Sequence, residues 1–152
     1  MGLKMSDRKL AEYLALGKAQ EVANRIKRGV IIGSDTFISF QGKRVGKPKD
    51  AGDARRILRM LSGKSMRIYS GIAIIDTQRK KTRVDSEVTI VKLKKLSDKE
   101  IRAYVQSGEP LDKAGAFAIQ GRGAVFIEKI NGCYSNVIGL PLYKLYLNLE
   151  KM

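Results

Sequence analysis

The sequence predicts an α/β fold in which helices flank a mixed β-sheet. Segments with apolar residues at three- and four-residue spacing alternate along the chain with segments that have the apolar runs or the two-residue period of strands. Two pairs of strand-like segments are joined by short polar turns, which indicates hairpins rather than a purely parallel sheet. The length of 152 residues suits one domain, so we expect a single domain over 1–152.

The first expected helix runs from Ser6 to about Arg28. Its apolar side is built from residues at helical spacing, namely Leu10, Leu14, Val22 and Ile26 with Ala11, Ala15, Ala19 and Ala23. The run Val30–Gly33 then has the composition of a short strand that is buried on both faces. This strand is expected to end at Ser34-Asp35-Thr36.

A small hairpin is predicted where residues 37–40 and 43–45 flank Gln41-Gly42, because the glycine supplies the positive φ of a tight turn. Asp50 is placed to cap a second helix. The apolar stripe of that helix is Ala54, Ile57, Leu58 and Leu61, and Gly63 ends it.

A second hairpin is expected from strands at 66–76 and 83–92, and the two-residue period of the latter places Asp85 and Glu87 on one face. The spacing of Ser97 and Glu100 predicts a capping box at the start of a third helix. A glycine-rich segment then leads to a strand at 124–130. A last helix begins after Pro141, with Leu142, Leu145 and Leu149 as its apolar stripe.

The composition excludes several classes of protein. The chain has no histidine and one cysteine, so Ser-His-Asp catalysis, imidazole zinc sites and internal disulfides are excluded. No apolar run reaches the length of a membrane span, and the first residues lack the pattern of a signal peptide, so a cytoplasmic protein without membrane contact is expected. Thirty basic and fifteen acidic residues give a net charge of +15, which attracts phosphate-bearing ligands.

Candidate functional residues are few. Asp35 would lie at the carboxyl end of a buried strand, where open α/β sheets place ligands, although it could equally cap a turn. Lys18, Lys47 and Lys113 lie next to glycine, proline or alanine and could meet phosphate as point charges, or simply be solvated. Gln120, in the glycine-rich loop, has an amide that suits the edge of a base, with loop solvation as the alternative.

Several segments occur together in a recognisable order. They are Leu16-x-Lys18-Ala19, Gly33-Ser34-Asp35-Thr36, Gly46-Lys47-Pro48-x-Asp50, Leu61-Ser62-Gly63, Ser86-Glu87-Val88 and the stretch GEPLDKAGAFAIQGRGAVFIEKINGCYSNVIGLPL at 108–142. In this order the chain resembles the Maf family of nucleoside triphosphate pyrophosphatases over essentially its whole length. The sequence around Lys113 and Gln120 resembles the branch that acts on dTTP and UTP.

The resemblance implies a fold similar to that of the inosine triphosphate pyrophosphatases, with a nucleotide cleft between two lobes. It also implies cleavage of a nucleoside triphosphate to the monophosphate and pyrophosphate with a divalent cation, Mg²⁺ or Mn²⁺. By the motif, Asp35 would be the proton acceptor, and Thr36 and Gln120 would govern substrate choice. Asp35 and Glu87 are the expected metal ligands, and the three lysines the expected phosphate contacts.

The family's usual first strand and its Ser-x-Ser-Pro-Arg-Arg loop have no counterpart in this sequence. We therefore expect an amino-terminally shortened domain with weak turnover and a tendency to self-associate, for example as a homodimer. A catalytically weak or inactive nucleotide-binding or regulatory protein is the alternative. A nucleic-acid-binding module is favoured only by the charge, and the low aromatic content of 7% makes it the least expected of the three.

Overall fold

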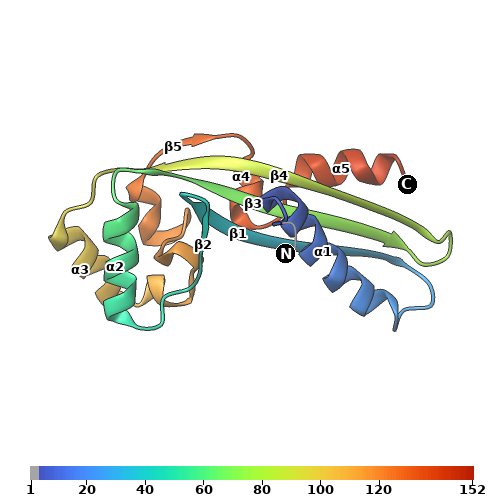
Figure 1. The fold of residues 1–152 in the computed structure, drawn as a ribbon, viewed down its shortest axis with the longest axis horizontal. Helices are drawn as coiled ribbons and strands as arrows, with labels where there is room; N and C mark the ends of the chain where they lie inside the picture. The colour runs from blue at the N-terminus through green and yellow to red at the C-terminus, as the bar shows by residue number, and fades with distance from the viewer. Residues whose placement is uncertain (1–3) are drawn as a thin grey trace. The chain divides into compact units, whose positions relative to one another are not determined.

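The computed structural model describes residues 4–152 and contains one five-stranded sheet with the strand order β2-β1-β3-β4-β5 (Figure 1). Helices flank this sheet, which confirms the predicted α/β class. The chain divides into two compact units. The first contains the residues up to Thr36 with Tyr69–Thr89 and Cys133–Met152, and the second contains Phe37–Ile68 and Ile90–Gly132. None of the helices in the described range has the length and apolar character needed to cross a bilayer.

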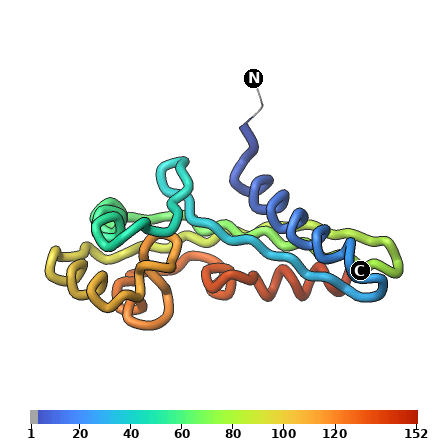
Figure 2. The backbone as a smooth tube through the Cα atoms, turned by 90° about the horizontal axis from the view of Figure 1, so that it is seen from below, coloured from blue at the N-terminus to red at the C-terminus, as the bar shows by residue number. Residues whose placement is uncertain are grey.

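The first unit combines three helices with parts of three strands. These elements are α1 (Asp7–Ala23), β1 (Val30–Phe40), β3 (Ser65–Asp76), β4 (Lys81–Leu93), α4 (Tyr134–Ile138) and α5 (Leu142–Glu150). Figure 2 shows the paths of α1 and α5 beside the strands of this unit. The strands β1, β3 and β4 also contribute residues to the second unit.

Helix α1 packs through alanines rather than through its larger residues. Ala11, Ala15 and Ala19 are buried, whereas Val22 and Ile26 are exposed. The helix begins as predicted, because the Ser6 hydroxyl accepts from the Lys9 amide, but it ends at Ala23 and not near Arg28. Leu10 and Leu14, predicted for the apolar side, are only partly buried.

The alanine stripe lies directly against two glycines of the sheet. A Cβ on Gly33 would lie 2.6 Å from the Ala15 carbonyl oxygen, and one on Gly71 would overlap the Ala11 carbonyl. Ala15 and Ala19 form one apolar cluster with Ile31 and Ala73. The close approach of helix and strands therefore requires glycine on the sheet and small residues on the helix.

Strand β1 is longer and less buried than predicted. Val30 and Ile32 are 53% and 44% exposed, and they alternate with the buried Ile31 and Gly33. Only one face of this end of the strand is therefore covered. The strand also continues to Phe40 without a break, so the predicted end at residues 34–36 is wrong.

The opposite face of β3 carries helix α5. Ile72 and Ile74 pack with Leu145 of α5, with Leu140 and Met152 at the edge of this cluster, while Ala73 between them packs with α1. This is the alternation that a strand covered on both faces requires. The predicted stripe of α5 is only partly confirmed, because Leu142 and Leu149 are 57% and 39% exposed.

The second unit holds two α-helices and three 3-10 helices beside its strand segments. Its further elements are β2 (Lys43–Val45), α2 (Ala51–Leu61), α3 (Asp98–Gln106), η1 (Glu109–Asp112), η2 (Ala114–Ala116), η3 (Gly121–Phe126) and β5 (Ile127–Asn131). Strand β2 pairs antiparallel with β1, and β5 pairs antiparallel with β4. The helix α2 contacts both α3 and η2.

Local signals in this unit are confirmed. Gln41 and Gly42, which join β1 to β2, both have positive φ, 51° and 78°. A two-residue hairpin turn with the twist of the flanking strands requires this conformation. Asp50 caps α2 by accepting from the Asp53 amide, and Ser97 and Glu100 form the predicted capping box of α3. One prediction is wrong: residues 121–126 form a 3-10 helix, and the strand predicted at 124–130 begins only at Ile127.

The glycine contact under α1 gives a direct test of this packing. Gly71→Ala should lower the free energy of unfolding by about 1–3 kcal/mol, because the methyl group would force α1 away from β3. Gly17→Ala is the matched control: a Cβ there has no atom within 4 Å, and alanine should stabilise the interior of α1 by about 0.5–1 kcal/mol. Urea unfolding followed by circular dichroism measures both. Equal effects of the two substitutions would contradict the close-packed contact.

Candidate active site

Asp35 lies within β1 and is paired with a lysine of α1. Its Oδ1 is 2.6 Å from the Lys18 Nζ, which also donates to the Ser34 carbonyl oxygen at 3.3 Å. The Asp35 side chain is 18% exposed and that of Lys18 is 59% exposed. Among residues 4–152, no donor bonds to the second carboxylate oxygen, Oδ2. One oxygen of the Asp35 carboxylate is therefore paired with the exposed Lys18 ammonium, and the other oxygen is available to a ligand.

The position of Asp35 differs from the sequence expectation. Ile31 and Gly33 face α1, so the two-residue period of the strand places Asp35 on the same face. Asp35 thus lies in the middle of a continuous strand, neither at a strand end nor in a turn. The Asp35–Lys18 pair was not anticipated, because two residues that are 17 positions apart become neighbours only when α1 folds back over β1.

The neighbours of Asp35 in the chain point to the other face and bond to the segment after α4. The Ser34 hydroxyl lies 3.0 Å from the carbonyl oxygens of both Gly71 and Gly139, which share its one hydrogen as acceptors. The Thr36 hydroxyl lies 2.6 Å from that of Ser70 and 3.2 Å from the Gly139 carbonyl oxygen. Thr36 is therefore part of a hydroxyl network, and this network fixes β1 on both sides of Asp35.

The network continues into α4, which the sequence analysis did not predict. The Ser70 hydroxyl donates to the Asn136 carbonyl oxygen at 3.2 Å, and the Asn136 amide donates to the Thr89 hydroxyl at 3.0 Å. Thr89 in turn donates to the Cys133 carbonyl oxygen at 2.8 Å. Because Ser70, Thr89 and Asn136 are buried, these bonds hold the turn of α4 against the sheet.

Asp85 and Glu87 have the alternation predicted for them, but neither joins Asp35. Asp85 accepts from Asn148 of α5 at 2.9 Å and lies 3.4 Å from the Lys144 Nζ. On the same strand, Thr89 donates to the carbonyl oxygen of Cys133, the residue before α4. Glu87 lies midway between Asp85 and Thr89 on the same strand, so the period of two places it on the α4 and α5 face. Asp35 faces α1, and the role of Asp35 and Glu87 as metal ligands stays a prediction.

The environment of Asp85 makes it a structural ion. Partial burial raises the pKa of this carboxyl, but bonds from Asn148 and from the Ser86 amide, with the charge of Lys144, outweigh that effect and hold the pKa below its ordinary value. Asp85 therefore links β4 to α5.

The described residues offer limited direct ligands to a metal ion. Residues 4–152 contain no group of three or more acidic or cysteine side chains close enough to hold one. A hard cation such as Mg²⁺ commonly uses only one or two carboxylates and takes its remaining oxygens from substrate phosphates and water. The Asp35 carboxylate fits that mode of binding.

Lys47 and Lys113 lie in two loops of the second unit that are bonded to each other. The Gly115 amide donates to the Gly46 carbonyl oxygen at 3.1 Å. Lys113 is 2.9 Å from the Asp112 carboxylate, and this bond, with the more distant charge of Lys47, holds the pKa of Asp112 below its ordinary value. The structure therefore groups two of the three lysines predicted to bind phosphate, and it pairs the third, Lys18, with Asp35.

Gln120 is exposed immediately before η3, and its side-chain amide bonds to none of the described residues. The loop around it is held from α3 and η1. Glu109 accepts from the amides of Arg122 and Gly123, both at 3.0 Å, and the Tyr104 hydroxyl accepts from the Ala118 amide at 3.2 Å. These bonds turn the chain into η3 where a strand was predicted, and they present the Gln120 amide on a fixed backbone.

Comparison with known proteins assigns this chain to a family. The family model described as "Maf-like protein" matches residues 3–152. A dTTP/UTP pyrophosphatase of Alkaliphilus metalliredigens is 53% identical over 144 residues, which cover 94% of this chain and 74% of the relative. One of Clostridium tetani is 48% identical over 141 residues, covering 91% and 73%. The chain therefore belongs to the Maf-like protein family, and the predicted resemblance is confirmed.

The support of the Gln120 loop by Glu109 predicts a pH dependence of stability. Partial burial raises the pKa of Glu109, but bonds from Tyr104 and from two backbone amides outweigh that effect, so the pKa lies below its ordinary value of 4.5. The ionised group therefore stabilises the fold above pH 4.5, and this contribution is lost as the pH falls through the lowered pKa.

We expect Glu109→Gln to unfold at lower urea concentration than the wild type at pH 6, with the difference shrinking as the pH falls below 4.5. Glu21→Gln, in an exposed pair with Arg25, serves as the control for loss of a surface carboxylate. A difference between Glu109→Gln and wild type that stays constant from pH 6 to pH 3 would contradict this role.

Proposed function

We propose that this chain hydrolyses nucleoside triphosphates, dTTP and UTP among them, to the monophosphate and pyrophosphate. The observation that carries the proposal is the similarity of nearly the whole chain to proteins named dTTP/UTP pyrophosphatase, at 44–53% identity. A partly exposed carboxylate beside a lysine, and a loop with an unengaged amide, are the features of the site that suit such a substrate.

Asp35 is the residue proposed to handle the attacking water. Its Oδ2 accepts a hydrogen bond from that water, orients it toward the α-phosphorus and takes its proton as the bond to the leaving pyrophosphate breaks. Lys18 balances the Asp35 charge in the free protein, and its exposed ammonium can turn to a phosphate oxygen when the triphosphate arrives.

A carboxylate alone is a weak base for activating water at neutral pH. A divalent cation, Mg²⁺ or Mn²⁺, held by Asp35 and by the substrate's own phosphate oxygens, would lower the pKa of water and offset the phosphate charge. The residues of the chain then supply orientation, the proton acceptor and the cations Lys18, Lys47 and Lys113 for the phosphates. Thr36, through its bonds to Ser70 and Gly139, holds the strand that carries Asp35.

The first test is the product and its dependence on Asp35. The wild type should release pyrophosphate and not orthophosphate from dTTP or UTP, only with Mg²⁺ or Mn²⁺ present, and Asp35→Asn should lower turnover by about 100-fold or more. The amide keeps the shape but accepts no proton. Glu150→Gln, an exposed carboxylate of α5, is the control. Orthophosphate as the sole product, or full turnover by a folded Asp35→Asn variant, would overturn the proposal.

The second test concerns substrate choice. Because the Gln120 amide bonds to none of the described residues, Gln120→Ala should leave stability unchanged and should alter the ranking of dTTP, UTP, dCTP and dGTP by kcat/KM. Removing one bond that reads a base changes its kcat/KM by about 10-fold. The same proportional change for all four nucleotides would show that Gln120 does not read the base.

A further inference from the structure

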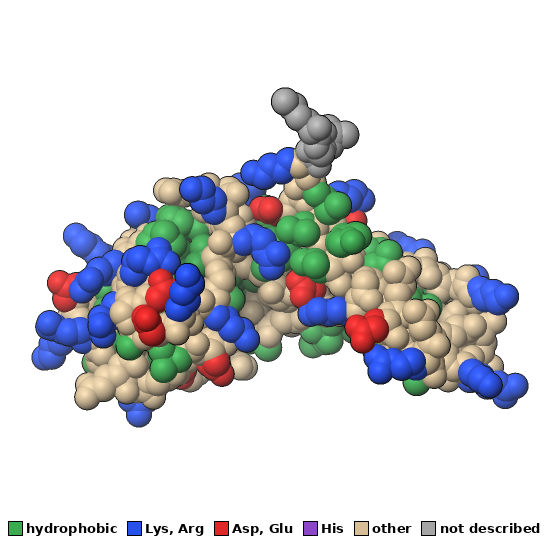
Figure 3. Space-filling model, turned by 60° about the horizontal axis from the view of Figure 1, so that its bottom comes forward, with side chains coloured by type: hydrophobic (Ala, Val, Ile, Leu, Met, Phe, Trp, Pro, Cys, Tyr) green, Lys and Arg blue, Asp and Glu red, His purple; other side chains and the backbone are tan. Residues whose placement is uncertain are grey.

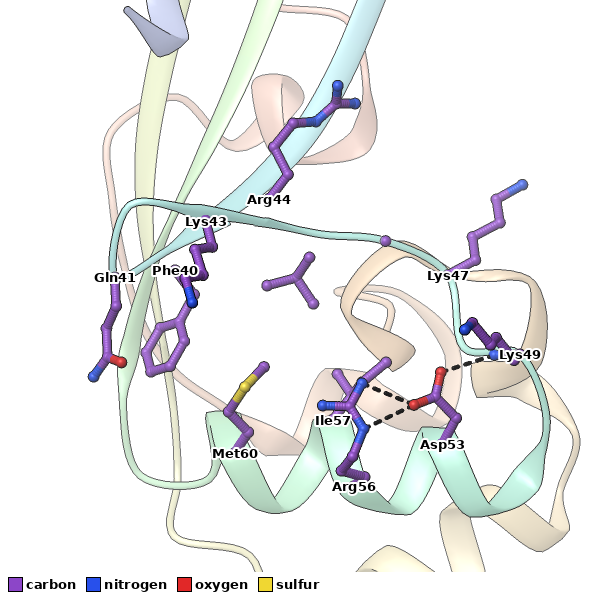
Figure 4. Close-up of a pocket in the computed structure, with 12 residues that line it drawn as sticks. Phe40, Gln41, Lys43, Arg44, Lys47, Lys49, Asp53, Arg56, Ile57 and Met60 are labelled. Atoms are coloured by element: carbon purple, nitrogen blue, oxygen red, sulfur yellow. Dashed lines mark hydrogen bonds and ion pairs between the residues drawn. The ribbon is translucent and has the colours of Figure 1, made fainter. Parts of the chain in front are cut away.

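The second unit contains a cavity that lies within this unit alone. It has a volume of about 500 Å³ and is bounded by the β1–β2 hairpin, the loop that follows it and α2 (Figure 4). Phe40 and Lys43 line it from the hairpin, and Ile57 and Met60 line it from α2. The cavity therefore has an apolar wall with a cation on its rim.

The cations around this cavity outnumber the carboxylates. Lys43, Arg44, Lys47, Lys49 and Arg56 line it, and Asp53 is the one carboxylate that does so. Asp53 is already bonded, 2.8 Å from Arg56 and 2.9 Å from the Lys49 amide, and the pKa of its carboxyl is held below the ordinary value by these bonds. Figure 4 shows Arg44 and Lys47 pointing away from the cavity, so their charges extend the basic rim outward.

The excess of cations extends over the whole second unit. The unit holds 17 lysines and arginines against 7 aspartates and glutamates, a net charge of +10. Each carboxylate is engaged: five are ion-paired, Asp50 caps α2, and Glu109 accepts backbone amides. Twelve of the 17 cations have no carboxylate within 4 Å in the described part of the chain, and Figure 3 shows Lys and Arg side chains gathered over this unit.

We propose that this cavity, with the cations around it, binds single-stranded nucleic acid, and that one nucleotide occupies the cavity. The half-buried Met60 can pack on the face of an unstacked base, and the rim cations, Lys43 among them, meet its phosphates. This binding goes beyond the hydrolysis of free nucleotides. It uses residues other than Asp35 and Gln120, and of the cations that line the cavity Lys47 alone is also proposed to contact the triphosphate.

Two observations favour a strand over the other polyanions. The unpaired cations spread over α2, α3 and the hairpin, which suits a chain of phosphates better than a single nucleotide. The apolar wall requires a partner with a planar apolar group, which polyphosphate lacks. A duplex keeps its bases stacked, so it could meet the rim but not the cavity. The low aromatic content made nucleic acid the least expected partner from sequence. That measure leaves out aliphatic side chains such as Met60, which line this cavity and can also pack on a base.

The test places one negative charge in the cavity without removing any cation. Met60 is half-buried in α2, so Met60→Glu and Met60→Gln should both fold, as thermal unfolding will show. Binding of a labelled 12-nucleotide strand without 5′-phosphate is followed by fluorescence anisotropy in 50 mM salt. We expect Met60→Glu to bind at least about 10-fold more weakly than Met60→Gln. Equal affinities, or no binding by the wild type, would overturn the proposal.

A salt series separates this site from the general charge of the molecule. Lys43→Ala with Lys49→Ala should reduce the slope of log affinity against log salt by about 1, as expected for loss of one to two phosphate contacts. Lys27→Ala with Arg28→Ala removes the same charge from the first unit and should leave the slope unchanged. An equal reduction by both pairs would mean attraction by net charge alone, and the proposed site would be wrong.

Competition identifies the ligand. Unlabelled single strand should displace the label at a lower nucleotide concentration than polyphosphate or duplex, and free UMP should displace it only at concentrations at least about 100-fold higher. Equal displacement by polyphosphate, duplex or UMP would overturn the assignment. Pyrophosphate release from dTTP, measured on the same variants, should be unaffected by Met60→Glu, so failure of this proposal is distinguishable from failure of the proposed enzymatic function.

Discussion

The close contact between α1 and the sheet is the constraint on which the candidate site depends. Three buried alanines of α1 face Gly33 and Gly71, and at these glycines the helix backbone comes close enough to leave no room for a Cβ. At this distance Lys18, which directly precedes the last alanine of the stripe, Ala19, reaches Asp35 on β1. A larger residue at either glycine would lift the helix and separate the two charges.

The two faces of β1 make different contacts around Asp35. On one face Asp35 meets Lys18 of α1, and on the other Ser34 and Thr36 bond to the carbonyl oxygen of Gly139. Hydroxyl bonds within a buried network are directional and restrict the strand. The carboxylate is therefore carried by a rigid strand rather than by a loop, which is the arrangement that keeps a reacting group in place at low entropic cost.

The second unit holds its loops in a comparable way, but with carboxylates. Glu109 accepts from two amides in the first turn of η3, and Asp53 accepts from the amide of Lys49 ahead of α2. Because these acidic groups are used internally, the surface of the unit is left with the cations. The bonds of these carboxylates within the unit therefore order the Gln120 loop. They also leave the cations of the cavity rim available, where nucleic-acid binding is proposed.

Local signals in the sequence determined the elements whose causes are local. The start of the first helix at Ser6, the caps at Asp50 and Ser97 and the Gln41-Gly42 turn lie where predicted, because each depends on residues within four positions of one another. The family also followed from short motifs read in order, and with it the expectation for Asp35 and Gln120. Periodicity could not show which side of α1 is buried, because alanine and leucine both fit the helical spacing.

Only the tertiary structure decided the contacts between distant segments. The Asp35–Lys18 pair, the bond between Asp85 and Asn148, and the 3-10 helix at Gly121–Phe126 all depend on partners that lie beyond the reach of local patterns. The strand at Val30–Gly33 reads as buried on both faces, yet Val30 and Ile32 are exposed because α1 covers one face only. Residue type determines what a side chain can bond to, and the fold determines which partner comes within reach.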